Sequence, residues 1–466
     1  MNNFFKAFLS FGLATSIEKL LGFILLPIYT KSFSSTEYGV IDMVMTIFQV
    51  CCVFGVLQLE TSLQRYYYDY IGLRRKMLIS TIYGWITIFS VILGLIMYLA
   101  SSYCSQFLFN TPEYSNLFKI VSIQLPLTNI SMLGLVLLRY ERANFKFLIV
   151  IITKVVFSLV FVYIFIIEMN YGLEGVFLSQ LLALLFSTLL VTYYVRNNFV
   201  FRISRFLSLK NFNYALPQFP ARIGSMMLGQ TNKFFMLGFL SLAAIGIYSV
   251  SLKLASSIQL VNTAFIMAWV PFMNAQFKNE NNKAVFANVF PLILGVTFLC
   301  VCFISLFSVE LVMLLATDEY IESSKYVGGL SLFFALYLIK EVVDIGPKIK
   351  EKTKYLSFTF LLSVIINIIS LTLFIRFFNL LGVVYAMIIT NLFLVLLSWT
   401  ISNRLYYIPF SKMKFFISFV PTLIIILLMM NFDLSFLIRV LIGVFVLLSF
   451  GYMILNSYRN VKRVLK

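Results

Sequence analysis

Histidine is absent from the 466-residue sequence, and cysteine is scarce. Because histidine titrates nearest neutral pH and is the commonest metal ligand, its absence excludes a histidine proton relay and a histidine metal site. The five cysteines form no disulfide or metal-binding pattern, since four lie within hydrophobic runs and Cys104 stands alone. We therefore expect no metal and no cofactor.

Charged residues are also few, at 12% of the chain, whereas 61% of residues are hydrophobic. This composition is too apolar for a soluble domain and predicts an all-α membrane protein. A transmembrane helix needs about 20 mostly apolar residues. The first candidate is too long and too charged for a cleaved signal peptide and is expected to stay in the membrane. About fourteen such helices are expected, at residues 8–30, 38–60, 78–101, 116–138, 147–168, 172–195, 214–240, 243–273, 285–309, 326–347, 355–376, 380–402, 415–431 and 434–456.

Basic residues outnumber acidic ones, 36 against 18, which gives a net charge of +18. Such an excess would suit nucleic acid, but the positions of the cations indicate membrane topology instead. The loops expected outside hold only Lys31, Lys325 and Arg376, whereas the loops on the other side are rich in lysine and arginine. By the positive-inside rule, both termini are expected to be cytoplasmic. The expected partners are membrane lipids, including anionic headgroups, and no nucleic acid.

The longest cytoplasmic connection, residues 196–212, is basic and marks a boundary between two lobes. A weak repeat supports this division, because a polar turn followed by a helix occurs at 32–50 and again at 239–258, with Gly39 and Gly246 in corresponding positions. Two six-helix halves of the same orientation give a parallel repeat. The expected organisation is an N-terminal lobe at 1–205, a C-terminal lobe at 206–402 and an appended helix pair with a cytoplasmic tail at 403–466.

Several charged side chains inside the predicted helices have an ordinary explanation. Lys119, Lys154 and Arg439 lie within two turns of a helix end, where a long side chain can extend to the lipid headgroups. Lys340 and Asp344 are four residues apart and are expected to form an ion pair on one helix face. The deeper cations are Lys19, Arg222, Lys233 and Lys253.

These deep cations lie on polar helix faces. Arg222 and Lys233 share one polar stripe, and Lys253 lies on another. If the faces meet across a central cavity, they predict a site for an anion such as phosphate, because arginine and lysine pair well with its oxygens. The alternative is that the cations only pair with Glu18, Asp42 or helix-end carbonyl groups and hold the bundle together.

Long stretches of both halves resemble one known family. The first half contains PIYTKSFSSTEYG and LQLETSLQRYYYD, at residues 27–39 and 57–69, and the second contains GIYSVSLKLASSIQLVNTAFIMAWVPF, at 246–272. Together with the helix count, they resemble the polysaccharide transporter family of Wzx-type O-antigen flippases. That family belongs to the multidrug/oligosaccharidyl-lipid/polysaccharide exporter (MOP) superfamily. The resemblance implies a two-lobed, MATE-like bundle that works by alternating access.

The resemblance also implies a cargo and a compartment. The cargo would be an undecaprenyl-pyrophosphate-linked oligosaccharide, such as an O-antigen or related repeat unit. It would cross a bacterial inner membrane and pass to polysaccharide polymerase machinery, with the four deep cations binding its pyrophosphate. Relatives often carry an acidic-basic pair where this chain has Asn232 and Lys233. Glu18 and Asp42 are then the titratable candidates for ion coupling.

Two other functions remain open. A cation-coupled multidrug exporter of the same fold would favour a carboxylate-rich cavity for cationic drugs, whereas the expected cavity is cationic. A membrane enzyme, such as an O-antigen polymerase or ligase, usually needs a sizeable loop outside the membrane. The longest outside loop, about residues 310–325, is short. The sequence therefore favours a flippase and not an enzyme.

Overall fold

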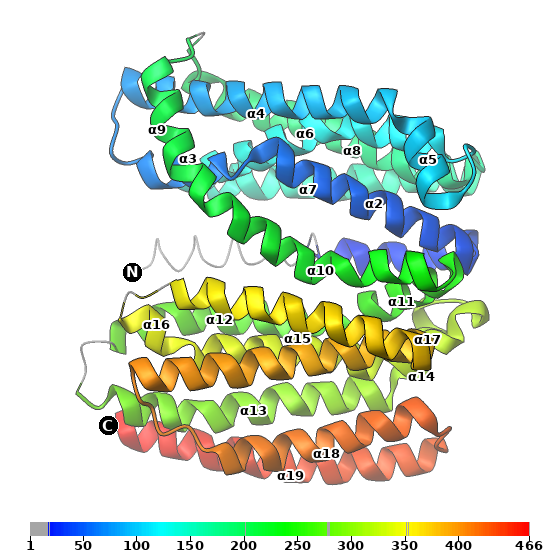
Figure 1. Ribbon diagram of the computed structural model, residues 1–466, viewed down its shortest axis with the longest axis vertical. Coiled ribbons are helices and arrows are strands. Elements are labelled where there is room, and N and C mark those ends of the chain that lie inside the picture. The colour runs from blue at the N-terminus through cyan, green and yellow to red at the C-terminus, as the bar shows by residue number, and fades with distance from the viewer. Residues whose placement is uncertain are drawn as a thin grey trace. The chain divides into compact units, whose positions relative to one another are not determined.

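The computed structural model describes residues 17, 19–200, 202–276, 280–350, 352 and 354–465, which form only helices and their connections (Figure 1). The predicted all-α class is confirmed. Ten helices in this part of the chain are long and apolar enough to cross a membrane. The chain divides into two compact units, Met1–Gln230 and Thr231–Lys466, and the division falls within one helix, α10. The predicted lobe boundaries stay predictions.

The first unit is built around α6, which contacts α2, α4 and α8. Each of the six helices expected before residue 196 has a helical counterpart, although the start of the first one lies outside the described residues. The elements of this unit are a helix at 19–32, α2 (Ser35–Val56), α3 (Leu59–Tyr66), α4 (Leu73–Leu99), α5 (Ser101–Phe109), α6 (Ser115–Tyr140), α7 (Asn144–Val162), η1 (Tyr163–Glu168), α8 (Gly172–Val195), η2 (Arg196–Asn198), α9 (Arg205–Ala215), η3 (Leu216–Gln218) and the first part of α10 (Phe219–Phe239).

The second unit is built around α15, which contacts α11, α12, α13, α17 and α18. The appended pair expected near the C-terminus is α18 and α19, and both helices pack on α13. The elements after α10 are α11 (Leu242–Ala255), α12 (Ile258–Gln276), α13 (Asn282–Leu306), α14 (Ser308–Leu315), η4 (Asp318–Ser323), α15 (Ser324–Val343), α16 (Ile345–Ile349), α17 (Lys354–Leu405), α18 (Lys412–Asn431) and α19 (Phe436–Leu465).

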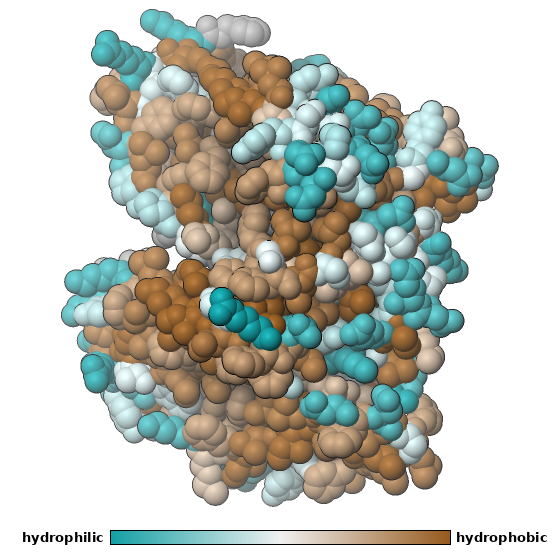
Figure 2. Space-filling model, turned by 45° about the vertical axis from the view of Figure 1, so that its right-hand side comes forward, coloured by the Kyte–Doolittle hydropathy of each residue, from teal (hydrophilic) through white to brown (hydrophobic). Residues whose placement is uncertain are grey.

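The surface is apolar, as a surface that faces lipid must be. Figure 2 shows broad hydrophobic bands along the sides of the helices, with hydrophilic side chains gathered mostly toward their ends. On α19, for example, the Phe445 side chain is 71% exposed and the Leu448 side chain 68%. Exposed hydrophobic side chains in such broad bands indicate a surface that hydrocarbon covers instead of water.

The turns that the hydropathy pattern barely marks occur at residues with positive φ. Asn170 (φ 53°) and Gly172 (φ 54°) separate η1 from α8, and Asn379 (φ 49°) breaks α17 into two helices. Asparagine and glycine tolerate this left-handed conformation best. The two parts of α17 fold back on each other, since Asn367 Nδ2 donates a hydrogen bond to Thr390 Oγ1 (3.3 Å).

The weak internal repeat corresponds to a shared capping arrangement. Ser34 caps α2, where its hydroxyl accepts a hydrogen bond from Glu37 N (3.3 Å) and Glu37 Oε2 accepts one from Ser34 N (2.9 Å). Ser241 caps α11 with the first of these two contacts, a hydrogen bond from Ala244 N to its hydroxyl (3.2 Å). Such serine caps satisfy backbone groups that a helix start leaves unpaired. In both turns the serine precedes the corresponding glycine, Gly39 or Gly246, by the same spacing.

The single helix expected at 243–273 is two helices, α11 and α12, and in this respect the expectation is wrong. The break lies at Ser256 and Ser257, whose hydroxyls donate to the carbonyl oxygens of Lys253 and Leu254. Serine hydroxyls offer local hydrogen bonds that compete with the helix ladder. Lys253 is therefore in the last turn of a shorter helix.

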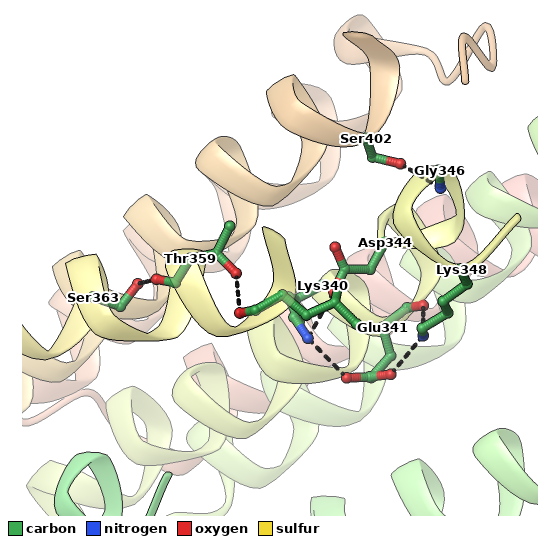
Figure 3. A network of polar contacts seen from close by, with 9 residues as sticks. Lys340, Glu341, Asp344, Gly346, Lys348, Thr359, Ser363 and Ser402 are labelled. Carbon is green, nitrogen blue, oxygen red and sulfur yellow. Dashed lines mark hydrogen bonds and ion pairs between the residues drawn. The ribbon is translucent and has the colours of Figure 1, made fainter. Parts of the chain in front are cut away.

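The expected ion pair between Lys340 and Asp344 is confirmed. Lys340 Nζ lies 2.7 Å from Asp344 Oδ2 and 3.1 Å from Glu341 Oε1, and Lys348 Nζ lies 3.0 Å from Glu341 Oε2. Figure 3 shows the four side chains as one chain of alternating charge at the end of α15. Lys340 and Asp344 are 2% and 1% exposed. Because every member has a partner of opposite charge, this network is a structural element of the second unit.

The expectation that Arg439 extends to the headgroups is wrong. Its side chain is 8% exposed, and its guanidinium makes two hydrogen bonds of 2.7 Å to the Glu310 carboxylate and one of 3.0 Å to Leu306 O. A planar guanidinium and a carboxylate match each other in such a two-point contact. The pair therefore fastens α19 to α14 instead of anchoring α19 in lipid headgroups.

We predict that Glu310→Ala lowers the free energy of unfolding by about 1–3 kcal/mol, because it leaves a buried guanidinium without its carboxylate. Thermal unfolding of the purified protein in detergent measures the loss. Asp318→Ala, which removes an exposed carboxylate from η4, is the matched control. Equal unfolding temperatures for the two variants would contradict the assignment.

Candidate functional site

A cavity of about 300 Å³ opens in the first unit beside the junction of α2 and α3. Helices α6, α7 and α8 and the first turns of α10 complete its wall. The lining residues are Cys52, Val53, Val56, Gln58, Glu60, Thr128, Asn129, Ser131, Met132, Leu135, Lys154, Leu184 and Arg222. The cavity is thus a mostly apolar hollow into which a few polar and charged groups converge.

A helix break places the polar groups of α3 in the cavity. Leu57 (φ 48°) and Gln58 (φ 61°) both adopt the left-handed conformation, which ends α2 and starts α3 in a new direction. Each such residue costs roughly 1–2 kcal/mol, so the surrounding packing must hold the break. Gln58 and Glu60 reach the cavity because the chain turns here.

Asn129 of α6 holds the end of α2 in position. Its Nδ2 donates to Cys52 O (3.3 Å) and to Ser90 Oγ of α4 (2.8 Å), so one amide joins three helices. The close approach requires glycine at position 55, because a Cβ on Gly55 would lie 2.5 Å from Asn129 Nδ2. The wall beside the helix break is therefore tightly packed.

Three charged residues line the cavity. Glu60 is half-buried, and its Oε2 is buried without a hydrogen-bond partner among the described residues. Arg222 is exposed, and its positive charge acts on the Glu60 carboxylate. Lys154 of α7 is half-buried and supplies a second cation. Of these described charges, the exposed Arg222 guanidinium is the one best placed to meet an anionic ligand.

The structure places the predicted residues of the first unit at different sites. Arg222 lines the cavity, whereas Lys19 and Asp42 are half-buried on other helices and are absent from the lining. Glu18 lies outside the described residues. The expectation that Lys154 only reaches lipid headgroups is wrong, because its side chain lines the cavity.

Sequence reasoning missed Glu60 as a site residue. It stands at the end of an expected helix, and no glycine or proline marks the break at Leu57 and Gln58. The signal that was available is the acidic residue inside LQLETSLQRYYYD, directly after a hydrophobic run. A carboxylate at that position needs a partner or water, as the deep cations do.

The remaining predicted cations belong to the second unit. Lys233 is 8% exposed on α10, next to Asn232, whose Oδ1 accepts a hydrogen bond from Asn367 Nδ2 (3.4 Å). Lys253 is half-buried in the last turn of α11. A cavity shared by these cations with Lys19 and Arg222 stays a prediction.

The comparison with protein families identifies the relatives of this chain. The family described as "Polysaccharide biosynthesis protein" matches residues 4–277. The chain belongs to this family. The resemblance seen in the two sequence stretches is thereby confirmed. No curated protein matches the chain at a significant level of similarity.

Solved structures give the fold of this family member. It is similar to the lipid II flippase MurJ in an inward closed conformation, with a TM-score of 0.73 at 17% identity over 96% of this chain and 99% of that one. It is also similar to an inward-facing MATE family multidrug resistance transporter, with a TM-score of 0.64 at 13% identity over 84% and 94% of the chains. A third similar structure is a MOP superfamily transporter from Pyrococcus furiosus, whose binding pocket is described as having reverse polarity. Its TM-score is 0.54 at 16% identity, over 86% of this chain and 95% of that one. The expected MATE-like fold is confirmed.

We predict that the cavity admits water. A cysteine introduced by Thr128→Cys, in a background without the native cysteines, should react with a small hydrophilic thiol reagent, because Thr128 lines the cavity. Leu133→Cys on the same helix should stay unmodified, because Leu133 is fully buried. Mass spectrometry of the protein labelled in membranes measures both reactions. Equal labelling of the two positions would show that the hollow is not a water-filled cavity.

Proposed function

We propose that this protein is a flippase for an undecaprenyl-pyrophosphate-linked oligosaccharide, such as an O-antigen or related polysaccharide repeat unit, in a bacterial inner membrane. The observation that carries the proposal is the cavity of the first unit, which the exposed Arg222 guanidinium lines together with several polar side chains. Membership of a polysaccharide biosynthesis family and a fold similar to transporters agree with it.

The chemistry of the cavity suits the head of such a lipid. A pyrophosphate carries several negative charges, and a guanidinium offers paired hydrogen-bond donors that match phosphate oxygens. Thr128 and Gln58 add polar groups that can hydrogen-bond to sugar hydroxyls. Only the charged head and the sugars need to enter this hollow, because the polyprenyl tail is as apolar as the surrounding lipid and can remain there.

Alternating access would carry the head from one leaflet to the other. In this proposal Lys19, Lys233 and Lys253 are further contacts for the pyrophosphate along its path. Glu60 joins Glu18 and Asp42 as a candidate for ion coupling, because Glu60 Oε2 is buried with no hydrogen-bond partner among the described residues and would gain from a proton or a cation. The product would leave to the outer leaflet, where a polysaccharide polymerase could take it.

A multidrug exporter is the second candidate, because the fold is also similar to a MATE family transporter. The charge of the cavity disfavours it. A cationic drug would have to approach the exposed Arg222 guanidinium in the lining. A lipid-linked anion meets no such repulsion.

We predict that Arg222→Gln reduces flipping of an undecaprenyl-pyrophosphate oligosaccharide at least about tenfold, because it removes a charge-assisted contact. The measurement is the movement of the lipid between leaflets of proteoliposomes. Lys119→Gln is the matched control, since Lys119 lies on cavity helix α6 but is not among the described lining residues. In a second experiment, the same assay measures transport by wild type and by Glu60→Gln at several pH values. If Glu60 takes up and releases the coupled proton, transport by Glu60→Gln should depend less on pH than transport by wild type.

Two results would decide against the proposal. If Arg222→Gln transports the lipid at the same rate as wild type, the cavity does not bind the anionic head through Arg222. Efflux of small organic cations, without movement of the lipid-linked sugar, would assign the protein to the drug exporters.

A further inference from the structure

A second hollow of the first unit lies where the chain between α8 and α9 crosses α4. It has a volume of about 700 Å³ and shares no lining residue with the cavity beside Glu60. Its lining residues are Ser80, Arg196, Phe199, Val200, Arg202 and Ile203. We call it the strap groove, because the described residues 199–200 and 202–215 include α9, which packs across α4 and α3 like a strap.

The strap groove lies at the basic end of the unit. Tyr68 Oη donates to Tyr140 O (3.0 Å), and Lys210 Nζ donates to Tyr70 Oη (2.8 Å), so the connections before α4 and α7 meet α9 there. Figure 1 shows α3 and α9 at the same end of the helices, opposite α5. The positive-inside rule predicts this end to be cytoplasmic, at the level of the inner-leaflet headgroups.

Hydrogen bonds to α4 fix the strap, so the groove is formed in advance. Ser80 Oγ accepts from Val200 N (2.9 Å), and Thr81 Oγ1 accepts from Ser204 N (3.1 Å). One turn further along α4, Trp85 Nε1 donates to Ser208 Oγ (2.8 Å). Three hydrogen bonds to side chains of α4 therefore hold this irregular segment and the start of α9 in place.

The groove combines two chemistries. Arg196 and Arg202 are exposed, no carboxylate is among the described lining residues, and neither guanidinium forms an ion pair with another described residue. The other lining side chains are apolar except for Ser80. Beside the groove, the side chains of Phe206 and Leu209 add exposed apolar surface, at 71% and 58% exposure.

We propose that the strap groove binds an anionic phospholipid of the inner leaflet. The headgroup phosphate would contact Arg196 and Arg202, and an acyl chain would lie along Phe199 and Ile203. Charge complementarity selects this occupant, because a zwitterionic lipid would bring a cation to two arginines that have no described acidic neighbour in the groove. The site is separate from the proposed transport cavity and binds a structural or regulatory lipid.

The test uses the purified full chain, stripped of lipid, and native mass spectrometry during titration with phosphatidylglycerol or phosphatidylcholine. We expect selective binding of phosphatidylglycerol, weakened about tenfold in Arg196→Gln/Arg202→Gln by the loss of charge-assisted contacts. The matched control is Arg142→Gln/Arg205→Gln, which removes the same charge from positions at this end of the unit that do not line the groove. The control should bind within about twofold of wild type, because only unspecific attraction is lost.

A steric variant tests the groove without changing its charge. A Cβ on Gly84 would lie 2.9 Å from Ile203 Cδ1, so Gly84→Val should displace the groove floor and weaken binding while the thermal unfolding temperature reports on folding. Equal weakening by the two double variants, or equal binding of phosphatidylcholine, would overturn the proposal. So would a clear preference of the same arginines for undecaprenyl pyrophosphate, which would make the groove a cargo site.

Discussion

The absence of hydrogen-bond partners in hydrocarbon is the constraint on which this structure depends. A polar group that no protein group satisfies there costs several kcal/mol. Hydroxyls inside the helices therefore donate to carbonyl oxygens of the preceding turn, as Ser249 does to Ile245 O and Thr422 to Ser418 O. Side-chain amides do the same between helices, as Gln124 of α6 does to Phe177 O of α8. Against this background Glu60 Oε2 is conspicuous, because it is buried and has no hydrogen-bond partner among the described residues.

The same constraint separates structural charges from candidate functional charges. Lys340 and Arg439 are almost completely buried, and each has a carboxylate within 2.7 Å. Such pairs are neutral and offer nothing to a ligand. Arg222 differs because it is exposed and lines the cavity, so its guanidinium can meet a ligand. The depth of a charged residue in the membrane does not tell whether its charge is structural or functional. The presence or absence of a buried carboxylate partner does.

Sequence reasoning predicted the helices well because hydrophobic length is a property of one segment. The turns at Asn170 and Asn379 were also recoverable, since asparagine tolerates positive φ. The helix break at Leu57 and Gln58 could not be predicted from the sequence, because neither residue favours the left-handed conformation. Packing against α4 and α6 enforces that conformation. Lys154 was misassigned for a related reason: its distance from a helix end is visible in the sequence, but the cavity wall that it faces is formed by other segments.

The net charge of +18 is likewise a sum over cations in different physical environments. Lys210 lies 4.4 Å from the Tyr66 ring and 5.0 Å from the Tyr70 ring, and its hydrogen bond to Tyr70 raises the pKa of the ammonium. Aromatic rings hold a cation in place without neutralising it. The Arg75 guanidinium is held in the same way, 4.7 Å from the Tyr67 ring. The tyrosines at 66, 67 and 70 therefore hold Lys210 and Arg75 at this end of the first unit without neutralising them, whereas Arg65 is paired with Asp69 (3.1 Å).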